Sequence, residues 1–166
     1  TKEEIEKDVE NVYQEELLYD SDAYIYLVRS KSGKVICSIR VFQWDKQVTL
    51  PIEKIFGINP LTSIGTHLDY WHVGRFAIDS FSGISTIKLF KQRMAMAIHP
   101  ILQHPNGCLI AETDIRLLKV MNLLGIATRQ LGPSTEHLSS ETVPICSSRD
   151  KLTPFYQSFC HLWPLS

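Results

Sequence analysis

One segment near the middle of the chain limits the possible folds more than any other. Residues 70–78 alternate like a β-strand, although they carry His72 and Arg75 among apolar side chains. After a Ser/Gly-rich turn, residues 84–102 place apolar side chains every three or four positions, as an amphipathic helix does. Residues 108–111 are then wholly apolar. A strand, a helix and a second strand in this order predict a parallel pair of strands joined by a crossover helix.

Antiparallel strands are expected before this unit. Residues 23–29 and 35–43 are rich in strand formers and are separated by a turn at 31–34. In the second strand Ser38 and Arg40 share one face, so a guanidinium is set into the sheet. Before and between these strands we expect a helix at 2–18, a short helix at 51–56, and a loop marked by Asn59-Pro60 and Gly65. After residue 111 we expect a helix that is capped by Thr113 and ended by Gly125, and strands at 126–131 and 141–146. A helix or turn is expected from Pro154. The predicted fold class is α/β (α+β), a mixed and mostly antiparallel sheet with helices on both faces, in a single domain over 1–166.

Composition excludes several classes of protein. With 166 residues, 44% hydrophobic and 21% charged, the chain is typical of a globular domain. A net charge of −1 gives no general attraction to nucleic acid, and no apolar run is long enough to span a membrane. The cysteines are widely spaced and the histidines show no metal-ligand spacing, so we expect reduced thiols, no metal and a cytoplasmic location.

Several motifs, taken in order, resemble the GNAT-type acyltransferase superfamily. The resemblance is greatest to the acyl-homoserine-lactone (autoinducer) synthases and the N-acyl amino acid synthases, and it extends over roughly residues 20–146. The motifs that carry it are Asp20-x-Asp22 before the first strand, Val35-Ile-Cys-Ser-Ile-Arg40, Trp71-His-Val-Gly-Arg75-Phe-Ala-Ile-Asp79, Ala111-Glu-Thr113, Leu131-Gly-Pro133 and Val143-Pro-Ile145.

The resemblance implies an N-acyltransferase. Its donor would be an acyl-CoA or the phosphopantetheine of an acyl carrier protein, and its acceptor a small-molecule amine such as an amino acid. A backbone N–H of the central strand would polarise the thioester carbonyl. The donor-binding positions implied are Phe76, Ile78, Gly83, Ser85, Thr86 and Thr113. A Ser/Gly turn that opens a helix suits a phosphate, although an ordinary N-cap needs the same residues.

The catalytic and acceptor-binding candidates come from the strands. His72 could take a proton from the amine, because an imidazole titrates at about pH 6.5, or it could be a hydrogen-bonded structural residue. Arg75, the second catalytic candidate, and Arg40 could hold a carboxylate of the acceptor. The alternative for both arginines is an internal salt bridge to an aspartate. The implied acceptor site consists of Arg40, Asp20 and Asp22, and the salt-bridge partners would be Asp20, Asp22 or Asp79.

The chain also departs from the family pattern. His72 occupies the position of the family's glutamate, the Gly-rich phosphate loop of ordinary acetyltransferases is missing, and Met121 stands where many of them have a tyrosine. An acetyl-CoA-dependent N-acetyltransferase and a non-catalytic ligand- or partner-binding domain therefore remain as alternatives. Lys88 and Lys91 could dock an acidic carrier protein or form a solvated helix face.

Overall fold

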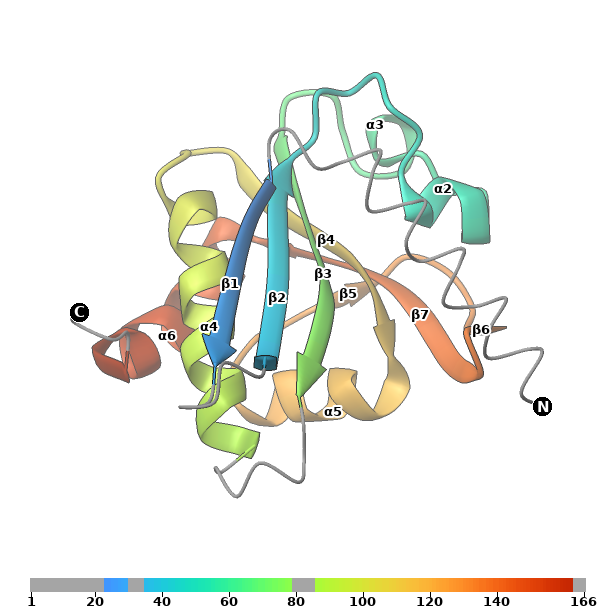
Figure 1. Ribbon diagram of the computed structural model, residues 1–166. Coiled ribbons are helices and arrows are strands. Elements are labelled where there is room, and N and C mark those ends of the chain that lie inside the picture. Colours follow the sequence, from blue (N-terminus) through green and yellow to red (C-terminus); the bar gives the residue numbers. More distant parts are fainter. Residues whose placement is uncertain (1–22, 30–34, 79–85, 163–166) are drawn as a thin grey trace.

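A seven-stranded sheet organises the described part of the chain (Figure 1). The computed structural model describes residues 23–29, 35–78 and 86–162. The helix predicted at 2–18 and the turn at 31–34 lie outside these ranges. The elements are β1 (Ala23–Arg29), β2 (Val35–Gln43), α2 (Pro51–Phe56), α3 (Pro60–Ser63), β3 (Asp69–Ile78), α4 (Thr86–Leu102), β4 (Gly107–Asp114), α5 (Ile115–Leu123), β5 (Arg129–Gln130), β6 (Thr135–His137), β7 (Ser140–Ser148), α6 (Arg149–Phe159) and the 3₁₀ turn η2 (Cys160–Leu162).

The sheet is mixed and mostly antiparallel, as the sequence predicts. Its strand order is β1-β2-β3-β4-β7-β5, and β6 pairs with β7 outside this path. Strands β3 and β4 are parallel and are connected by α4, whereas the other pairings among the described strands are antiparallel. The predicted strand–helix–strand unit is therefore confirmed, and it lies at the centre of the sheet.

Helices α4 and α6 cover one face of this sheet. Most of the apolar positions that predict α4 are buried here, namely Phe90, Met94, Ala97 and Ile101, whereas Ile87 in the first turn is 42% exposed. Phe155 of α6 packs edge-on against Phe90, with 6.3 Å between the ring centroids. Burial of one side chain of this size stabilises the fold by roughly 1.5–3 kcal/mol. The larger of the two apolar clusters lies in this layer, which is therefore the main core.

The short helices α2 and α3 cover the opposite face, and a smaller apolar cluster lies beneath them. Helix α2 begins at Pro51 and ends before Gly57, whose φ of 67° suits a glycine C-cap. Tyr70 of β3 is fully buried in this cluster, and its hydroxyl donates to the carbonyl of Gly65 at 2.6 Å. The loop that follows α3 is thereby tied to the central strand.

Two sequence-based assignments are wrong because a side chain caps a helix at an unexpected residue. Asn59 does not continue a loop; its Oδ1 accepts from the N–H of Leu61 at 2.9 Å and starts α3. Thr113 is not the cap of α5, since the chain is still extended there. Asp114 is the cap, and its carboxylate accepts from the N–H of Arg116 at 2.7 Å.

Other boundaries move by several residues. The strand expected at 126–131 is reduced to β5, only Arg129–Gln130, while β7 is longer than predicted. Helix α6 starts at Arg149, five residues before the expected Pro154, so this proline lies inside the helix and not at its start. The last turn of α4 likewise contains Pro100, and the helix ends two residues later at Leu102. None of the helices in the described ranges is long and apolar enough to cross a membrane.

Candidate active site

A β-bulge interrupts the pairing of β2 with β3 near the middle of the sheet. Arg40 lies opposite Gly74 and Ser38 lies opposite Ala77, so β3 contains one residue more than β2 between these pairs. Arg75 is in this bulge and has a φ of 53°, in the left-handed region that non-glycine residues avoid. Such a backbone costs on the order of 1–3 kcal/mol, and the surrounding pairing must hold it in place.

The bulge also changes the direction of the residues that follow it. Without the extra residue, strict alternation would place Phe76 on the same face as Gly74. Instead Phe76 packs against the α4 core, where its ring meets Phe90 edge-on at a centroid distance of 5.2 Å. The strand can thus keep an aromatic anchor in the core while Arg75 lines the adjacent cavity.

Strands β3 and β4 separate directly beside the bulge. Their parallel pairing runs only from Asp69 opposite Gly107 to His72 opposite Ile110. Beyond this point β3 stays paired with β2, and β4 stays paired with β7 as far as Asp114. The gap that opens between the two central strands contains a cavity of about 300 Å³.

The cavity is lined from both faces of the sheet. His72 and Glu112 come from the face covered by α2 and α3, whereas Val73, Ala111 and Met94 belong to the α4 side. Because residues of both faces line one space, the cavity passes between the separated strands. One end is polar and the other is apolar.

The polar end contains a hydrogen-bonded pair of buried side chains. His72 Nε2 lies 2.9 Å from Oε1 and 3.0 Å from Oε2 of Glu112, and the exposed fractions of the two side chains are 4% and 9%. A carboxylate can only accept, so Nε2 carries the hydrogen and donates it to Glu112. This bond fixes the tautomer of the imidazole.

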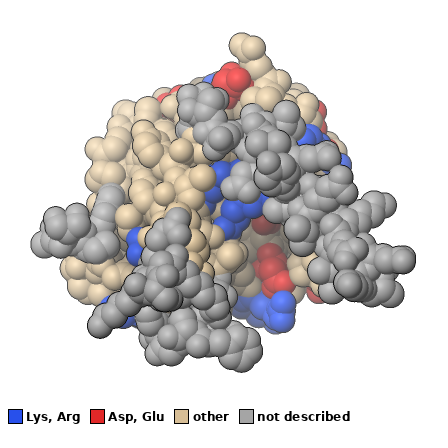
Figure 2. Space-filling model, in the orientation of Figure 1, with Lys and Arg blue, Asp and Glu red and all other residues tan. Residues whose placement is uncertain are grey.

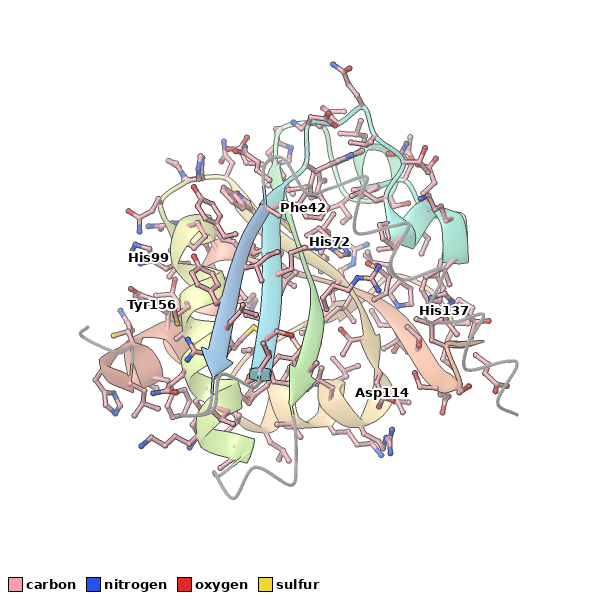
Figure 3. All side chains as sticks on the ribbon, viewed as in Figure 1. Phe42, His72, His99, Asp114, His137 and Tyr156 are labelled. Carbon is pink, nitrogen blue, oxygen red and sulfur yellow. The ribbon has the colours of Figure 1, made fainter. Side chains whose placement is uncertain are left out.

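The rest of the imidazole ring is packed tightly. Phe42, directly across the β2–β3 ladder, lies 5.1 Å from it between ring centroids (Figure 3). A Cβ on Gly74 would come within 2.9 Å of His72 Cε1, so glycine is needed for this approach. Nδ1 is enclosed and has no hydrogen-bond partner among the described residues. His72 therefore interacts with the site through Nε2 and Glu112.

Charges of both signs surround the cavity. Arg40 is buried, with its guanidinium carbon 5.6 Å from the centroid of Phe42, and Arg75 is half-buried; both line the cavity. Glu112 and Asp114 line it from β4. Hydrogen bonding to Arg116 lowers the pKa of Asp114 and favours its ionised form. Figure 2 shows basic and acidic side chains close together near the hollow on this side of the molecule.

The structure brings together part of the predicted site. His72, Arg75, Phe76, Arg40 and Thr113 all line the cavity, although Thr113 does so as a buried strand residue and not as a helix cap. Ile78 ends β3 and Thr86 begins α4, with no description of their side chains. Asp20, Asp22, Asp79, Gly83 and Ser85 lie outside the described residues. Within the described ranges no cluster of three metal-ligating side chains occurs.

Glu112 is the cavity residue whose role the sequence did not predict. In the sequence it stands within the Ala111-Glu-Thr113 motif, and only Thr113 of that motif is a predicted site residue. The available signal was its place in the alternation, because Cys108, Ile110 and Glu112 share the face that buries Tyr70 and His72. A carboxylate on an inward-facing strand position needs a partner, and His72 is that partner.

Comparison of the sequence with protein-family models and with curated proteins gives no match. Solved structures do resemble the fold of this chain. The acyl-homoserine lactone synthase LasI superposes with a TM-score of 0.63 at 18% identity, covering 81% of this chain and 70% of its own. FeeM, an N-acyl amino acid synthase from uncultured soil microbes, has a TM-score of 0.59 at 14% identity, covering 95% and 94%.

A third neighbour is BjaI, a CoA-dependent acyl-homoserine lactone synthase whose structure contains SAM and isopentyl-CoA. It has a TM-score of 0.63 at 16% identity and covers 86% of this chain and 67% of its own. At these identities the likeness establishes the fold and leaves the activity open. The chain has the GNAT-like fold of these synthases, as the motifs of its sequence predict.

Proposed function

We propose that the protein is an N-acyltransferase that moves an acyl group from a thioester to the amine of a small acceptor. The observation that carries this proposal is the separation of β3 from β4 beyond His72. The separation opens a cavity that has one polar end and one apolar end. A thioester donor also has two such parts, an apolar acyl chain and a polar arm. The fold shared with LasI, BjaI and FeeM supports the same reading.

The reaction would use the cavity as follows. The acceptor enters as an ammonium and loses one proton to a base; its nitrogen lone pair then attacks the thioester carbonyl carbon. The C–S bond breaks, and the departing sulfur takes the second proton from the nitrogen, so that an amide and a thiol result. No described strand pairs with β3 on the side of the gap, so backbone N–H groups there can polarise the carbonyl.

Arg40 and Arg75 would hold an acidic group of the acceptor, because guanidinium groups bind carboxylates in a bidentate manner. They line the cavity on the β2–β3 side, while the carboxylates of Glu112 and Asp114 line it on the β4 side. This distribution of charge suits a zwitterionic acceptor such as an amino acid. His72 as the base is a prediction from the sequence, and Glu112 is a second candidate from the structure.

The test begins with donor binding. Full-length protein is melted with coenzyme A, acyl-CoA thioesters of several chain lengths and an acylated carrier protein, since a ligand of the native state raises the melting temperature by mass action. A panel of amino acids and other amines is then added, and amide products are detected by mass spectrometry. The test variant is Ala111→Met, because Ala111 lines the cavity and a longer side chain there should narrow it while His72 and Glu112 are left in place.

We expect at least one donor to stabilise the wild type in a concentration-dependent way and to yield an amide. The Ala111→Met variant should bind that donor more weakly. Absence of any shift at millimolar donor, together with absence of any amide, would refute the acyltransferase. Donor binding without amide formation for any acceptor would instead favour a non-catalytic ligand-binding domain.

A further inference from the structure

The carboxylate of Glu112 is a buried acidic group that lines the cavity. Its side chain is 9% exposed, and among the described residues its one hydrogen-bond donor is His72 Nε2. A carboxylate has about four lone-pair directions, and this single N–H occupies little of that capacity. Glu112 can therefore accept further hydrogen bonds from a ligand in the cavity.

The imidazole of His72 lacks this capacity. Its Nε2 hydrogen is already donated to Glu112, and the lone pair on Nδ1 is enclosed on the ring edge that packs against Gly74. Phe42 covers the ring on a further side. A base must lie within hydrogen-bond reach of the proton that it takes, so the closed Nδ1 is badly placed to meet an amine.

We propose that Glu112 is the group that contacts the acceptor's ammonium and takes its proton, and that His72 is a positioning residue for Glu112. This inference rests on the proposed acyl transfer and names the base in it. One N–H of the ammonium donates to the carboxylate, the proton passes to an Oε atom, and the freed lone pair attacks the thioester carbon. The Nε2–H of His72 holds the carboxylate in place, and this hydrogen is not transferred during the reaction.

The arrangement places a carboxylate beside His72. In the motif that the sequence resembles, the position of His72 belongs to a glutamate, and here Glu112 brings a carboxylate to the same imidazole from the adjacent parallel strand. His72 lies opposite Ile110 in the ladder, and Glu112 is two residues further along β4 on the same face. The strands have just separated at this point, so the carboxylate reaches the opening of the gap.

The test compares three variants of the full chain. Glu112→Gln keeps the shape and removes the base. His72→Gln keeps an N–H donor near the position of Nε2, and His72→Phe keeps a ring without a donor. With the donor and acceptor found for the wild type, we expect Glu112→Gln to lower kcat/KM by about 10²–10⁴-fold and His72→Gln by less than about tenfold. Urea melts of each variant correct the rates for the folded fraction.

The split between kcat and KM separates positioning from mere folding. His72→Phe keeps a ring but removes the N–H that orients the carboxylate of Glu112, so kcat per folded molecule should fall more than in His72→Gln while the KM for the donor stays unchanged. Arg40, Arg75, Asp114 and His137 also line the cavity, but they are unchanged in all variants; the lining residues from α2, α4 and α5 are uncharged. Any other ranking, such as an active Glu112→Gln or a His72→Gln that loses as much, overturns the assignment.

A binding measurement makes the inference independent of turnover. The ¹³C-carboxyl resonance of Glu112, identified by its disappearance in Glu112→Gln, is followed while n-butylammonium is added. We expect a saturable shift in the wild type, and no shift would refute the amine contact. A shift without acyl transfer to any amine would refute the transferase while keeping the amine site. Acyl transfer by Glu112→Gln at the wild-type rate would refute Glu112 as the base while keeping the transferase.

Discussion

Replacing Gly74 by alanine tests the packing of His72 most directly. The new Cβ would lie 2.9 Å from Cε1 and 3.5 Å from Nδ1 of the imidazole. Carbon atoms prefer a separation of about 3.5–4.0 Å, so the ring would have to shift by roughly half an ångström or more. Phe42 packs on the ring and Glu112 binds Nε2, so this movement has to disturb one of these contacts.

The expected cost follows from these contacts. Overpacking of a buried site costs about 1–3 kcal/mol, and a weakened hydrogen bond to a charged group costs a similar amount. Alanine returns about 0.4–1 kcal/mol by restricting the unfolded chain, and Gly74 does not have the positive φ that would strain alanine. We therefore expect Gly74→Ala to lower the free energy of unfolding by roughly 1–3 kcal/mol, measured by urea denaturation.

Gly65→Ala is the matched control. Its Cβ would lie 3.0 Å from Cε1 of His67, nearly the same nominal clash, but that imidazole is exposed and can rotate away. This variant should change stability by less than about 0.5 kcal/mol. Equal costs for the two variants would refute the reasoning, because the difference depends entirely on His72 being held by its neighbours.

Three further predictions concern other parts of the fold. Gly107→Ala should cost more than about 3 kcal/mol in urea melts, because its Cβ would lie 2.2 Å from the backbone carbonyl oxygen of Ile101, and a stable variant would contradict this. Burial raises the pKa of Tyr70 to about 12. Its contribution to the free energy of unfolding is therefore complete below about pH 10 and is lost as the pH rises to about 12, and Tyr70→Phe should abolish that loss in melts across this range. Changing both Lys88 and Lys91 to glutamate should weaken carrier-protein binding several-fold at low salt and little at high salt. Equal binding by the wild type and this variant at low salt would refute docking of the carrier protein on Lys88 and Lys91.

Local pattern alone determined most of the elements. The alternation of residues 35–43 predicted β2 with its exact bounds, and it placed Arg40 on the face opposite the Ile39 core. The three- and four-residue spacing predicted α4, and Pro51 with Gly57 delimited α2. These features depend on neighbours in sequence, through φ/ψ preference and periodic burial, so a single sequence suffices to predict them.

The tertiary structure alone decided how the site is assembled. His72 and Glu112 are 40 residues apart in the chain, and only the register of β3 against β4 brings Nε2 within 2.9 Å of the carboxylate. The bulge at Arg75 depends on the pairing of β3 with β2, and the gap depends on β4 following β7 away from β3. Strand pairing is a non-local choice made by the burial of both faces together, and no local pattern encodes where two strands stop pairing.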